Sequence, residues 1–529
     1  MPNYDPPAGV FQDIPPAGPQ MMWWSGYNIR FRLDKIETIG LMVPLKDTSN
    51  DQLVLPGPGL YRRVFTTPST TTGQILFGSN ADLRLAEFDP ASTPLQGTRW
   101  ALYNITPAGL PAISDVLTDP SAGRIEIPPV WWFSDQDDVV VGCRAGGTTE
   151  PCYSWNRDRT MPFAPLANSP VGAVGGGILN RILTLLGCTS LTEPDPRRFM
   201  TIRWSDRYNF TDWTPTDLNL SGELQLEGGS RIVGGGVTGF GVIAWTDKRM
   251  AVLTETFDNN VYERRYIDGG RGMLANQSWC EADGQVFWID ENRVLNTFDG
   301  GRPRQLINTM KYATLETISD IQAARIYMQP NPEYSEILIW YPEGADGVPN
   351  VALVFNYALN AWYPWRLLRT GWCQRFGVIP AIAIDDDNQI WQQDIDIGLD
   401  APWRSIASPF TVQAADVEPF DFEFQSNLVT TEAPAVDTHH RTRVIVDHMK
   451  ASPAGLAQPD TFSLTLRGFG KTSMNSDYIE ETKVYPAGSN EQDFRVGGKA
   501  LQMTVFGDDV KTLFRFGTFF TKDAKDGER

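Results

Sequence analysis

The residue types that most often carry enzymatic chemistry are sparse in this chain. Its three histidines, His439, His440 and His448, all lie close to the C-terminal end. The long segment before them therefore has no histidine with which to build a Ser–His–Asp triad or a His-ligated zinc site. This excludes two of the commonest kinds of enzyme site from most of the sequence.

The five cysteines are odd in number and mostly far apart; they are Cys143, Cys152, Cys188, Cys280 and Cys373. No Cys-x-x-Cys pair is present. Cys143 and Cys152 could bridge a hairpin loop, but we favour free, buried thiols, as expected of a protein made in a reducing cytoplasm.

Glycine runs and acidic clusters give no stronger indication of chemistry. The runs at 175–177 and 234–236 lack the Lys-Ser/Thr of a phosphate-binding loop, so we expect them between strands, as turns or points of close backbone approach. Residues 135–138 and 385–388 lack the distal Glu of a calcium loop and are expected at hairpin tips. Among 64 acidic residues, no carboxylate pair for glycoside hydrolysis stands out. We therefore predict no catalytic, metal-binding or cofactor-binding residues, and no cofactor.

The segment 203–215 is the most informative motif, and it reads Arg-Trp-Ser-Asp-Arg-Tyr-Asn-Phe-Thr-Asp-Trp-Thr-Pro. Asp206 and Asp212 can accept hydrogen bonds from backbone amides of a tight turn, while Trp204 and Trp213 pack over it. Such corners are typical of β-propeller blades. The segment also imitates the Ser-x-Asp-x-Gly-x-x-Trp box of sialidase propellers but lacks its glycine, so we interpret it as a structural corner.

Composition and charge indicate a large, folded, acidic protein. The 529 residues, 41% of them hydrophobic and 11% aromatic, suit several folded domains. The formal net charge of −19 argues against tight, sequence-independent binding to nucleic acid. The pairs at 62–63, 197–198 and 264–265 are scattered arginines, expected on the solvated surface or in weak ion pairs. No apolar run is long enough for a membrane span, and we expect no signal peptide at the N-terminus.

The pattern of strands, turns and prolines divides the chain into three regions. Residues 1–21 are rich in proline and predict an extended arm. Between 22 and 404, an apolar strand, a polar turn, a second strand and a Trp-rich corner recur, which predicts a β-propeller of about six blades, within a range of five to seven. Residues 405–529 predict an antiparallel, β-sandwich-like module. The fold class is thus all-β, with short helices expected at 308–317 and 319–326, the second with Ser319 as its N-cap.

Short motifs spread over much of the chain carry a resemblance to a known family. They are Trp24-x-x-x-Asn28-Ile29-Arg30-Phe31-Arg32, Glu37-Thr38-Ile39-Gly40, and the segments 203–215, 266–272, 287–301, 497–502, 514–517 and 527–529. In this order they resemble the tail nozzle, or tail hub, proteins of short-tailed bacteriophages. Leu41 departs from the pattern, which has a second glycine there, and only loosens that turn.

The resemblance implies a propeller subunit present in six copies per tail, forming a tube below the portal and adaptor proteins. Such a homo-hexamer would hold DNA in the filled head, carry fibres or spikes, and open for ejection. The protein would then be a structural part of the virion rather than an enzyme, made in the cytoplasm of the bacterial host. Six acidic subunits would form a channel that double-stranded DNA passes without tight binding. We further hypothesise that loops around residues 344–349 and 451–459 form the gate.

Two other classes of function stay open. A propeller glycosidase on the virion would hydrolyse saccharides and would depend on an Asp or Glu. A glycan-binding or scaffolding propeller would stay monomeric and would bind its ligands through exposed aromatic side chains.

Overall fold

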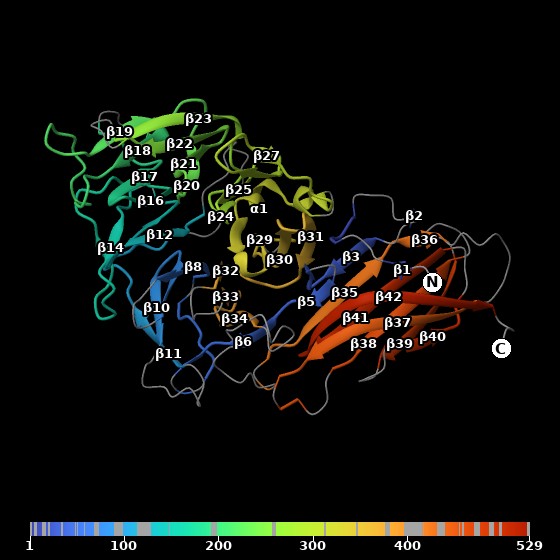
Figure 1. The fold of residues 1–529 in the computed structure, drawn as a ribbon. Helices are drawn as coiled ribbons and strands as arrows, with labels where there is room; N and C mark the ends of the chain where they lie inside the picture. Colours follow the sequence, from blue (N-terminus) through green and yellow to red (C-terminus); the bar gives the residue numbers. More distant parts are fainter. Residues whose placement is uncertain are drawn as a thin grey trace.

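The computed structural model consists almost entirely of β-strands (Figure 1). It describes residues 3–4, 8–12, 17–18, 22–32, 35–47, 49, 51–57, 59–67, 73–88, 99–113, 128–147, 149–191, 198–256, 261–311, 314–344, 347–375, 381–395, 415, 417–430, 440–453, 455–456, 460–469, 477–485, 491–496 and 500–525.

Seven consecutive four-stranded units, the blades, form a β-propeller in the described part of the chain. Blade 1 contains β8 (Tyr61–Thr67), β9 (Gln74–Ser79), β10 (Leu83–Phe88) and β11 (Arg99–Asn104). Blade 2 contains β12 (Trp131–Gln136), β13 (Val139–Arg144), β14 (Tyr153–Trp155) and β15 (Ala164–Pro165). Blade 3 contains β16 (Gly175–Leu179), β17 (Ile182–Leu186), β18 (Thr201–Trp204) and β19 (Gly222–Gln225). Blade 4 contains β20 (Ile232–Thr238), β21 (Gly241–Thr246), β22 (Arg249–Glu255) and β23 (Tyr262–Arg271). Blade 5 contains β24 (Trp279–Ala282), β25 (Gln285–Ile289), β26 (Leu295–Phe298) and β27 (Arg304–Gln305). Blade 6 contains β28 (Tyr327–Asn331), β29 (Glu336–Tyr341), β30 (Val351–Asn356) and β31 (Ala361–Trp365). Blade 7 is β32 (Gly371–Cys373), β33 (Ala381–Ile384), β34 (Ile390–Ile395) and β6 (Leu41–Pro44).

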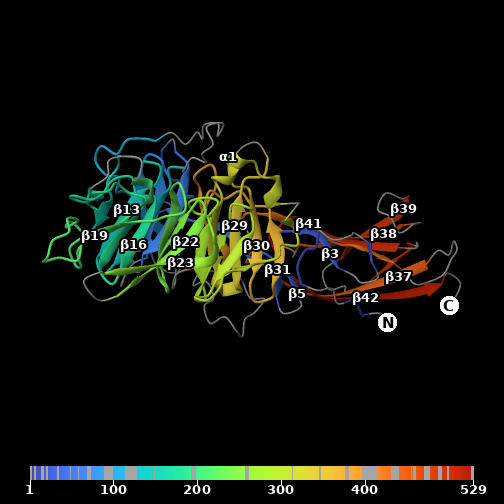
Figure 2. The ribbon, with the colours of Figure 1, turned by 90° about the horizontal axis from the view of Figure 1, so that it is seen from above.

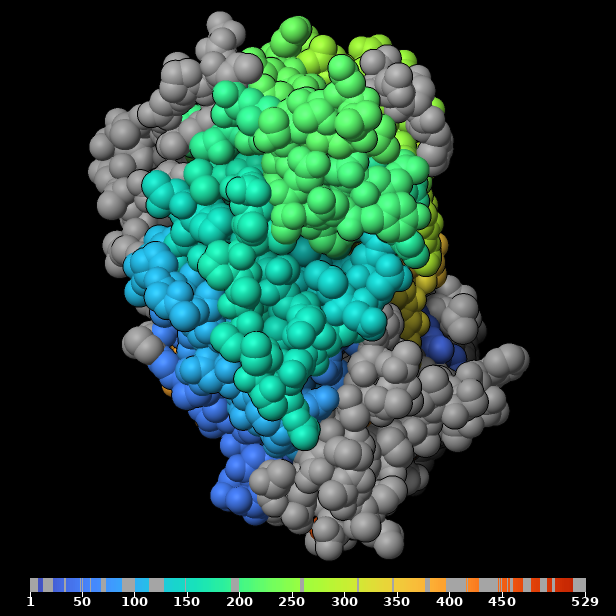
Figure 3. Space-filling model, turned by 90° about the vertical axis from the view of Figure 1, so that its left-hand side faces the viewer, coloured from blue at the N-terminus to red at the C-terminus, as the bar shows by residue number. Residues whose placement is uncertain are grey.

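The blades follow one another around a common axis, each with its first strand innermost (Figure 1). β7 (Lys46–Asp47) adds a parallel edge strand to blade 1. Blade 7 takes its fourth strand, β6, from the N-terminal part of the chain, which closes the ring. The side of the propeller away from the sandwich is formed largely by blades 1 to 3 (Figure 3). The predicted all-β propeller is confirmed, with seven blades where about six were expected. The seven blades lie within the expected range of five to seven.

A β-sandwich lies beside the propeller (Figure 2). One of its sheets contains β1 (Asn3–Tyr4), β4 (Ile29–Arg32), β5 (Lys35–Thr38), β37 (His440–Ala451), β40 (Glu491–Phe494) and β42 (Leu513–Lys525). The other contains β2 (Ala17–Gly18), β3 (Trp23–Tyr27), β35 (Phe420–Ser426), β36 (Leu428–Thr430), β38 (Phe462–Phe469), β39 (Tyr478–Tyr485) and β41 (Ala500–Val510).

The sandwich is built from both ends of the chain, which differs from the predicted domain boundaries. Residues 23–38, which the sequence analysis assigned to the propeller, pair with strands of the C-terminal region. The two strands of the predicted arm, β1 and β2, pair with β42 and β36 of the same sandwich. Residues 8–12 are also described, and the Val10 amide donates to the backbone oxygen of Trp362 at 2.7 Å. The prediction failed because strand alternation within residues 27–39 does not indicate which distant strand is the partner.

The two modules share a hydrophobic core. Trp23 and Phe424 of the sandwich and Trp340 and Trp362 of blade 6 belong to one cluster of buried side chains. The indole of Trp365 also donates a hydrogen bond to the backbone oxygen of a sandwich residue, Ile29, at 3.2 Å. Blade 6 therefore packs against the sandwich, and the same cluster of buried side chains extends to Trp391 of blade 7.

Helical structure is short. α1 (Asp320–Ala323) begins at the predicted N-cap, where Ser319 and Gln322 form a capping box. The rest of this predicted helix is a turn that leads into β28. In the described part of the other predicted helix, 308–317, the structure has the short 3-10 helix Leu315–Thr317 and no α-helix. No helix in the described ranges is long and apolar enough to cross a membrane.

Candidate functional site

The first strands of the blades surround a cavity of about 250 Å³, which we call the central cavity. Its walls come from six of the seven blades, and it is partly open to solvent. Trp132 of blade 2 and Trp279 of blade 5 give it aromatic surface, while Asn276 and Gln277 contribute amide groups. Asn276 is already engaged, since its Nδ2 donates to the backbone oxygens of blades 3 and 4 at 2.7 and 2.8 Å.

Both glycine runs lie at this cavity, in the inner strands β16 and β20. Gly176 and Gly236 pair in parallel, which joins blades 3 and 4 into one eight-stranded sheet. A Cβ atom on Gly175 would lie only 2.6 Å from the backbone oxygen of Gly235. The predicted close backbone approach is confirmed, but the prediction that the runs lie between strands is wrong. Runs without side chains offer no alternation from which a strand can be recognised.

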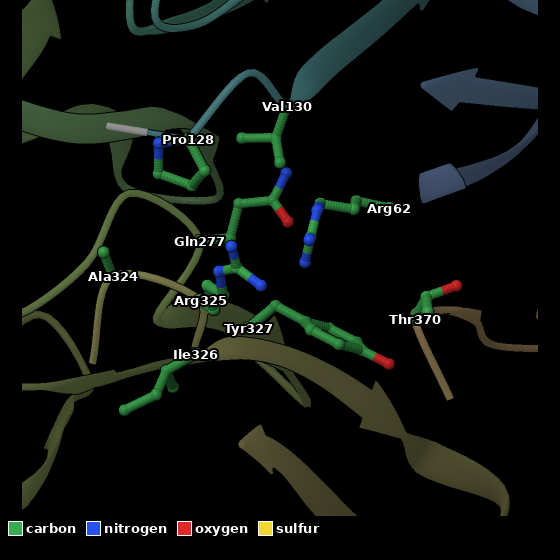
Figure 4. A pocket seen from close by; sticks show the side chains of 9 residues that line it. All are labelled: Arg62, Pro128, Val130, Gln277, Ala324, Arg325, Ile326, Tyr327 and Thr370. Atoms are coloured by element: carbon green, nitrogen blue, oxygen red, sulfur yellow. The ribbon is translucent and has the colours of Figure 1, made fainter. Parts of the chain in front are cut away.

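Two consecutive arginines of β8 line two different cavities of the propeller. The pairing of β8 with β9 shifts register between Tyr61 and Arg63, so Arg62 is the extra residue of a β-bulge. A bulge changes the side to which the following side chain points. Arg63 consequently lines the central cavity, while Arg62 lines a small space of about 10 Å³ (Figure 4). Gln277 lines both. The prediction that this arginine pair lies on the solvated surface is wrong.

Arg63 is a cation without a counterion. Among the described residues, no carboxylate forms an ion pair with it, and its Nε atom is buried without a hydrogen-bond partner. Burial lowers the pKa of the Arg63 guanidinium, and only a weak effect from Cys373 opposes this. An arginine still stays charged at neutral pH, so the cavity contains a positive charge that forms no ion pair with a described residue.

The opposite charge in the central cavity comes from Glu281 of β24. Its Oε1 atom accepts a hydrogen bond from the backbone amide of Gly239 at 3.0 Å. The neighbouring Cys280 is a free thiol whose pKa is raised by burial, so it stays protonated at neutral pH and is no nucleophile. The lining of the cavity is therefore suited to holding a polar ligand rather than to covalent chemistry.

A second polar cluster, the Arg30 cluster, lies between the sandwich and the propeller. Arg30 of β4 donates to both carboxylate oxygens of Glu336 (2.6 and 2.9 Å) and of Asp394 (3.0 and 2.7 Å). Asn331 donates to both acids, and the Tyr363 hydroxyl donates to Glu336. The Arg30 side chain is 2% exposed, so these contacts are made in the interior.

The protonation of the two acids responds to opposing influences. Burial raises the pKa of Glu336, and the neighbouring Arg30 only partly offsets this. Burial also acts to raise the pKa of Asp394, but the charge and hydrogen bonds of Arg30, with those of Asn331 and Gly40, leave it lowered. The cluster joins two modules in the interior, so we assign it a structural role.

The Trp-Ser-Asp corner connects β18 and β19 and is structural, as interpreted from the sequence. Trp204 and Trp213 are buried, and the Trp204 indole donates to the backbone oxygen of Leu220 at 2.8 Å. Asp206 accepts from the Leu220 amide at 2.8 Å, and Asp212 accepts from a backbone amide two residues further on at 3.4 Å. The predicted hydrogen bonds and tryptophan packing are confirmed.

The acidic clusters at the hairpin tips are also engaged in local structure. Asp135 pairs with Arg157 at 2.9 Å. Asp385 accepts hydrogen bonds from the amide of Gln389 and the indole of Trp391, both at 2.8 Å. In the part of the chain that the structure describes, no three His, Cys, Asp or Glu side chains are grouped as metal ligands would be.

Cys143 and Cys152 are joined by a disulfide, with their Cα atoms 4.6 Å apart. The prediction of free thiols is wrong for this pair. The register of β13 and β14, which pairs Gly142 with Tyr153, places the two cysteines opposite each other. The remaining cysteines are free and buried, as predicted; they are Cys188, Cys280 and Cys373.

Comparisons with known proteins bear on the fold alone. No family model and no curated protein matches the chain. Similar solved structures include the WD40 domain of Pan2 from Neurospora crassa (8% identity, TM-score 0.39, covering 67% of this chain and 96% of that one). They also include the WD40 domain of coronin from Toxoplasma gondii (8%, TM-score 0.35, 73% and 87%) and apo AztD from Citrobacter koseri (8%, TM-score 0.35, 66% and 91%). At these scores they support no inference about function.

Proposed function

We propose that this chain is a structural subunit of the tail nozzle of a short-tailed bacteriophage. Six copies form a ring in the virion, below the portal and adaptor proteins, and double-stranded DNA passes through the channel of that ring. The ring also offers attachment points for fibres or spikes.

The observation that carries this proposal is the meeting of two motifs from opposite ends of the chain. The motif around Arg30 and Glu37 forms β4 and β5, and the motif that ends near Phe516 forms the start of β42. Glu37 pairs with Arg515 in strand register and in an ion pair, and Ile36 pairs with Phe516. Unrelated short segments that resemble a family by chance have no reason to lie on adjacent strands. Their convergence on one sheet supports a shared architecture.

The charge of the chain agrees with a channel that DNA passes. The net charge of −19 gives six subunits a strongly acidic sum. Some of the cations are also unavailable to phosphate groups, because Arg30 and Arg144 are buried and engaged with carboxylates inside the subunit. Retention of packaged DNA would then depend on a constriction rather than on basic adhesion.

The predicted gate loops have only partly described structure. The loop at 344–349 connects β29 and β30, and residues 345–346 lie outside the described residues. Its ends are held near α1, since Gln322 donates to the Gly344 oxygen and Arg325 to the Gly347 oxygen. The loop at 451–459 follows β37, and residues 454 and 457–459 lie outside the described residues. Deleting each loop from phage particles tests the gate: unchanged DNA retention and ejection would remove it from consideration.

A glycosidase is the alternative that the central cavity could suggest. Hydrolysis of a glycosidic bond commonly needs two carboxyl groups about 5–10 Å apart. Of the described residues that line the cavity, Glu281 alone has a carboxyl group. Purified protein is therefore expected to leave saccharides intact, and hydrolysis lost in an Asp or Glu variant would favour the enzyme.

Cryo-electron microscopy of intact particles tests the proposed function. The expected result is sixfold density for this propeller and sandwich on the tail axis, below the portal. Density on a peripheral fibre or spike would refute the nozzle and favour a glycan-directed role. Particles that assemble without this chain provide the control, since they should lack the ring and lose packaged DNA.

A further inference from the structure

The guanidinium of Arg63 forms no ion pair with a described residue, so binding of an anion in the central cavity would be favourable. A charged group that is removed from bulk water and left without a partner is unfavourable, and folded proteins usually pair it. Arg63 has no ion pair among the described residues, although acidic residues outnumber basic ones in the chain. The β-bulge at Arg62 turns this side chain toward the cavity. The site is therefore prepared for a negative group supplied from outside the chain.

The chemistry of the cavity walls narrows the class of anion. A guanidinium group presents a planar pair of donors that matches a carboxylate. The Trp132 indole also lines the cavity, and its Nε1 atom is a second buried donor without a hydrogen-bond partner. A phosphate dianion is disfavoured, because the carboxylate of Glu281 lies in the same cavity. One positive and one negative group suit a ligand with a single carboxylate and additional hydroxyl groups.

Size and surface point to a compact ring. About 250 Å³ is below the range typical of pockets for drug-sized molecules, so the ligand must be small. Trp132 and Trp279 supply flat apolar faces, against which a ring-shaped body can pack. The carboxylate of Glu281 can accept hydrogen bonds from hydroxyl groups of such a ring.

We propose that the central cavity binds a small hydroxylated carboxylate of the hexuronate type, with Arg63 holding its carboxylate and Glu281 its hydroxyl groups. This binding site is separate from the proposed nozzle function, since it lies within one subunit. It can therefore exist whether or not the chain forms a ring.

Titration calorimetry of the purified full chain with glucuronate tests the site, and glucose serves as the matched ligand without a carboxylate. We expect saturable binding of glucuronate and at least about tenfold weaker binding of glucose. Arg63→Gln should weaken glucuronate binding by a similar factor and leave the weak glucose signal unchanged. Arg265→Gln is the matched control, because Arg265 is an exposed arginine on β23 and its loss removes the same charge from the surface.

Three results would overturn the proposal. They are no binding of glucuronate at tens of millimolar, equal binding by the wild-type chain and Arg63→Gln, or equal binding of glucuronate and inorganic phosphate. If Arg63→Gln fails to fold, ligand-induced changes in the thermal midpoint of the wild-type chain replace it. Glucuronate must then raise the midpoint more than glucose at the same concentration, and equal shifts would refute a carboxylate site.

Discussion

Replacing Arg30 with methionine should destabilise the whole protein, because it leaves two buried carboxylates without their cation. The Glu336 side chain is 0% exposed and that of Asp394 is 5% exposed, and Arg30 makes two hydrogen bonds to each. Removing one partner of a buried ion pair costs roughly 3–5 kcal/mol, since the remaining charge is uncompensated. Asn331 and Tyr363 still donate to the acids, so we expect Arg30→Met to lower the free energy of unfolding by about 3–4 kcal/mol.

The loss should depend on pH in a defined direction. In the wild-type protein the pKa of Glu336 is raised and that of Asp394 is lowered, so their contributions to stability change with pH in opposite senses. Without Arg30, burial dominates and raises the pKa of both acids. A raised folded-state pKa gives stability that is fully present below the unfolded value, about 4, and is lost as pH rises through the folded value. Arg30→Met should therefore be more destabilised at pH 7.5 than at pH 4.5.

Urea unfolding followed by tryptophan fluorescence measures this loss, with circular dichroism as a second probe for coincident transitions. Arg304→Met is the control: its ion pair with Asp299 is also close, at 3.2 Å, but both side chains are about half exposed, so about 0–1 kcal/mol is expected. Adding Glu336→Gln and Asp394→Asn to Arg30→Met should recover roughly half of the loss. The reasoning fails if Arg30→Met costs less than about 1 kcal/mol, or if its cost does not grow with pH.

Three further predictions concern the propeller. Arg63→Met should raise the stability of the ligand-free protein by about 1 kcal/mol in urea unfolding, since it removes an unpaired charge, and a loss of stability would indicate an overlooked partner. Reducing the disulfide between Cys143 and Cys152, nine residues apart, should cost about 2–3 kcal/mol in the same assay, and an unchanged midpoint with full reduction would contradict this. Gly235→Ala should lower the free energy of unfolding by at least about 3 kcal/mol, because its Cβ atom would lie 2.1 Å from a backbone oxygen. Gly109→Ala is the control: its Cβ atom meets open space, so a loss of about 1 kcal/mol is expected. Similar losses for the two variants in thermal unfolding would refute the close approach.

The propeller could be predicted from the sequence because its blades are hairpins of neighbouring strands. Turns at 134–138 and 290–292 connect strands that do pair in the structure. The Trp-Ser-Asp corner was predictable for the same reason, since Asp206 and Trp204 bond within the same loop. Local contacts of this kind are encoded within a few residues.

Long-range partners could not be predicted in this way. β6 completes a blade whose other strands lie more than 300 residues later, and β5 pairs with β42. The central cavity was missed because Arg62 and Arg63 resemble any surface pair until a bulge, which leaves no mark in a single sequence, directs Arg63 inward. The Arg30 cluster was missed since Glu336 and Asp394 are two of 64 acidic residues. Identifying them requires the fold.

Because the sandwich is built from both ends of the chain, it can form only after the C-terminal strands have been synthesised. Ile36 pairs with Phe516, so at about 5–20 residues per second a ribosome needs roughly half a minute to a minute and a half between making the two. During that interval the hairpins of the blades can form, but β4 and β5 have no sheet to join. Nascent chains would expose the edges of β4 and β5, and chaperones would be needed to keep these edges from aggregating. Completion of β42 would then act as a checkpoint, because only a chain that includes it can bury both ends and offer a finished subunit for assembly.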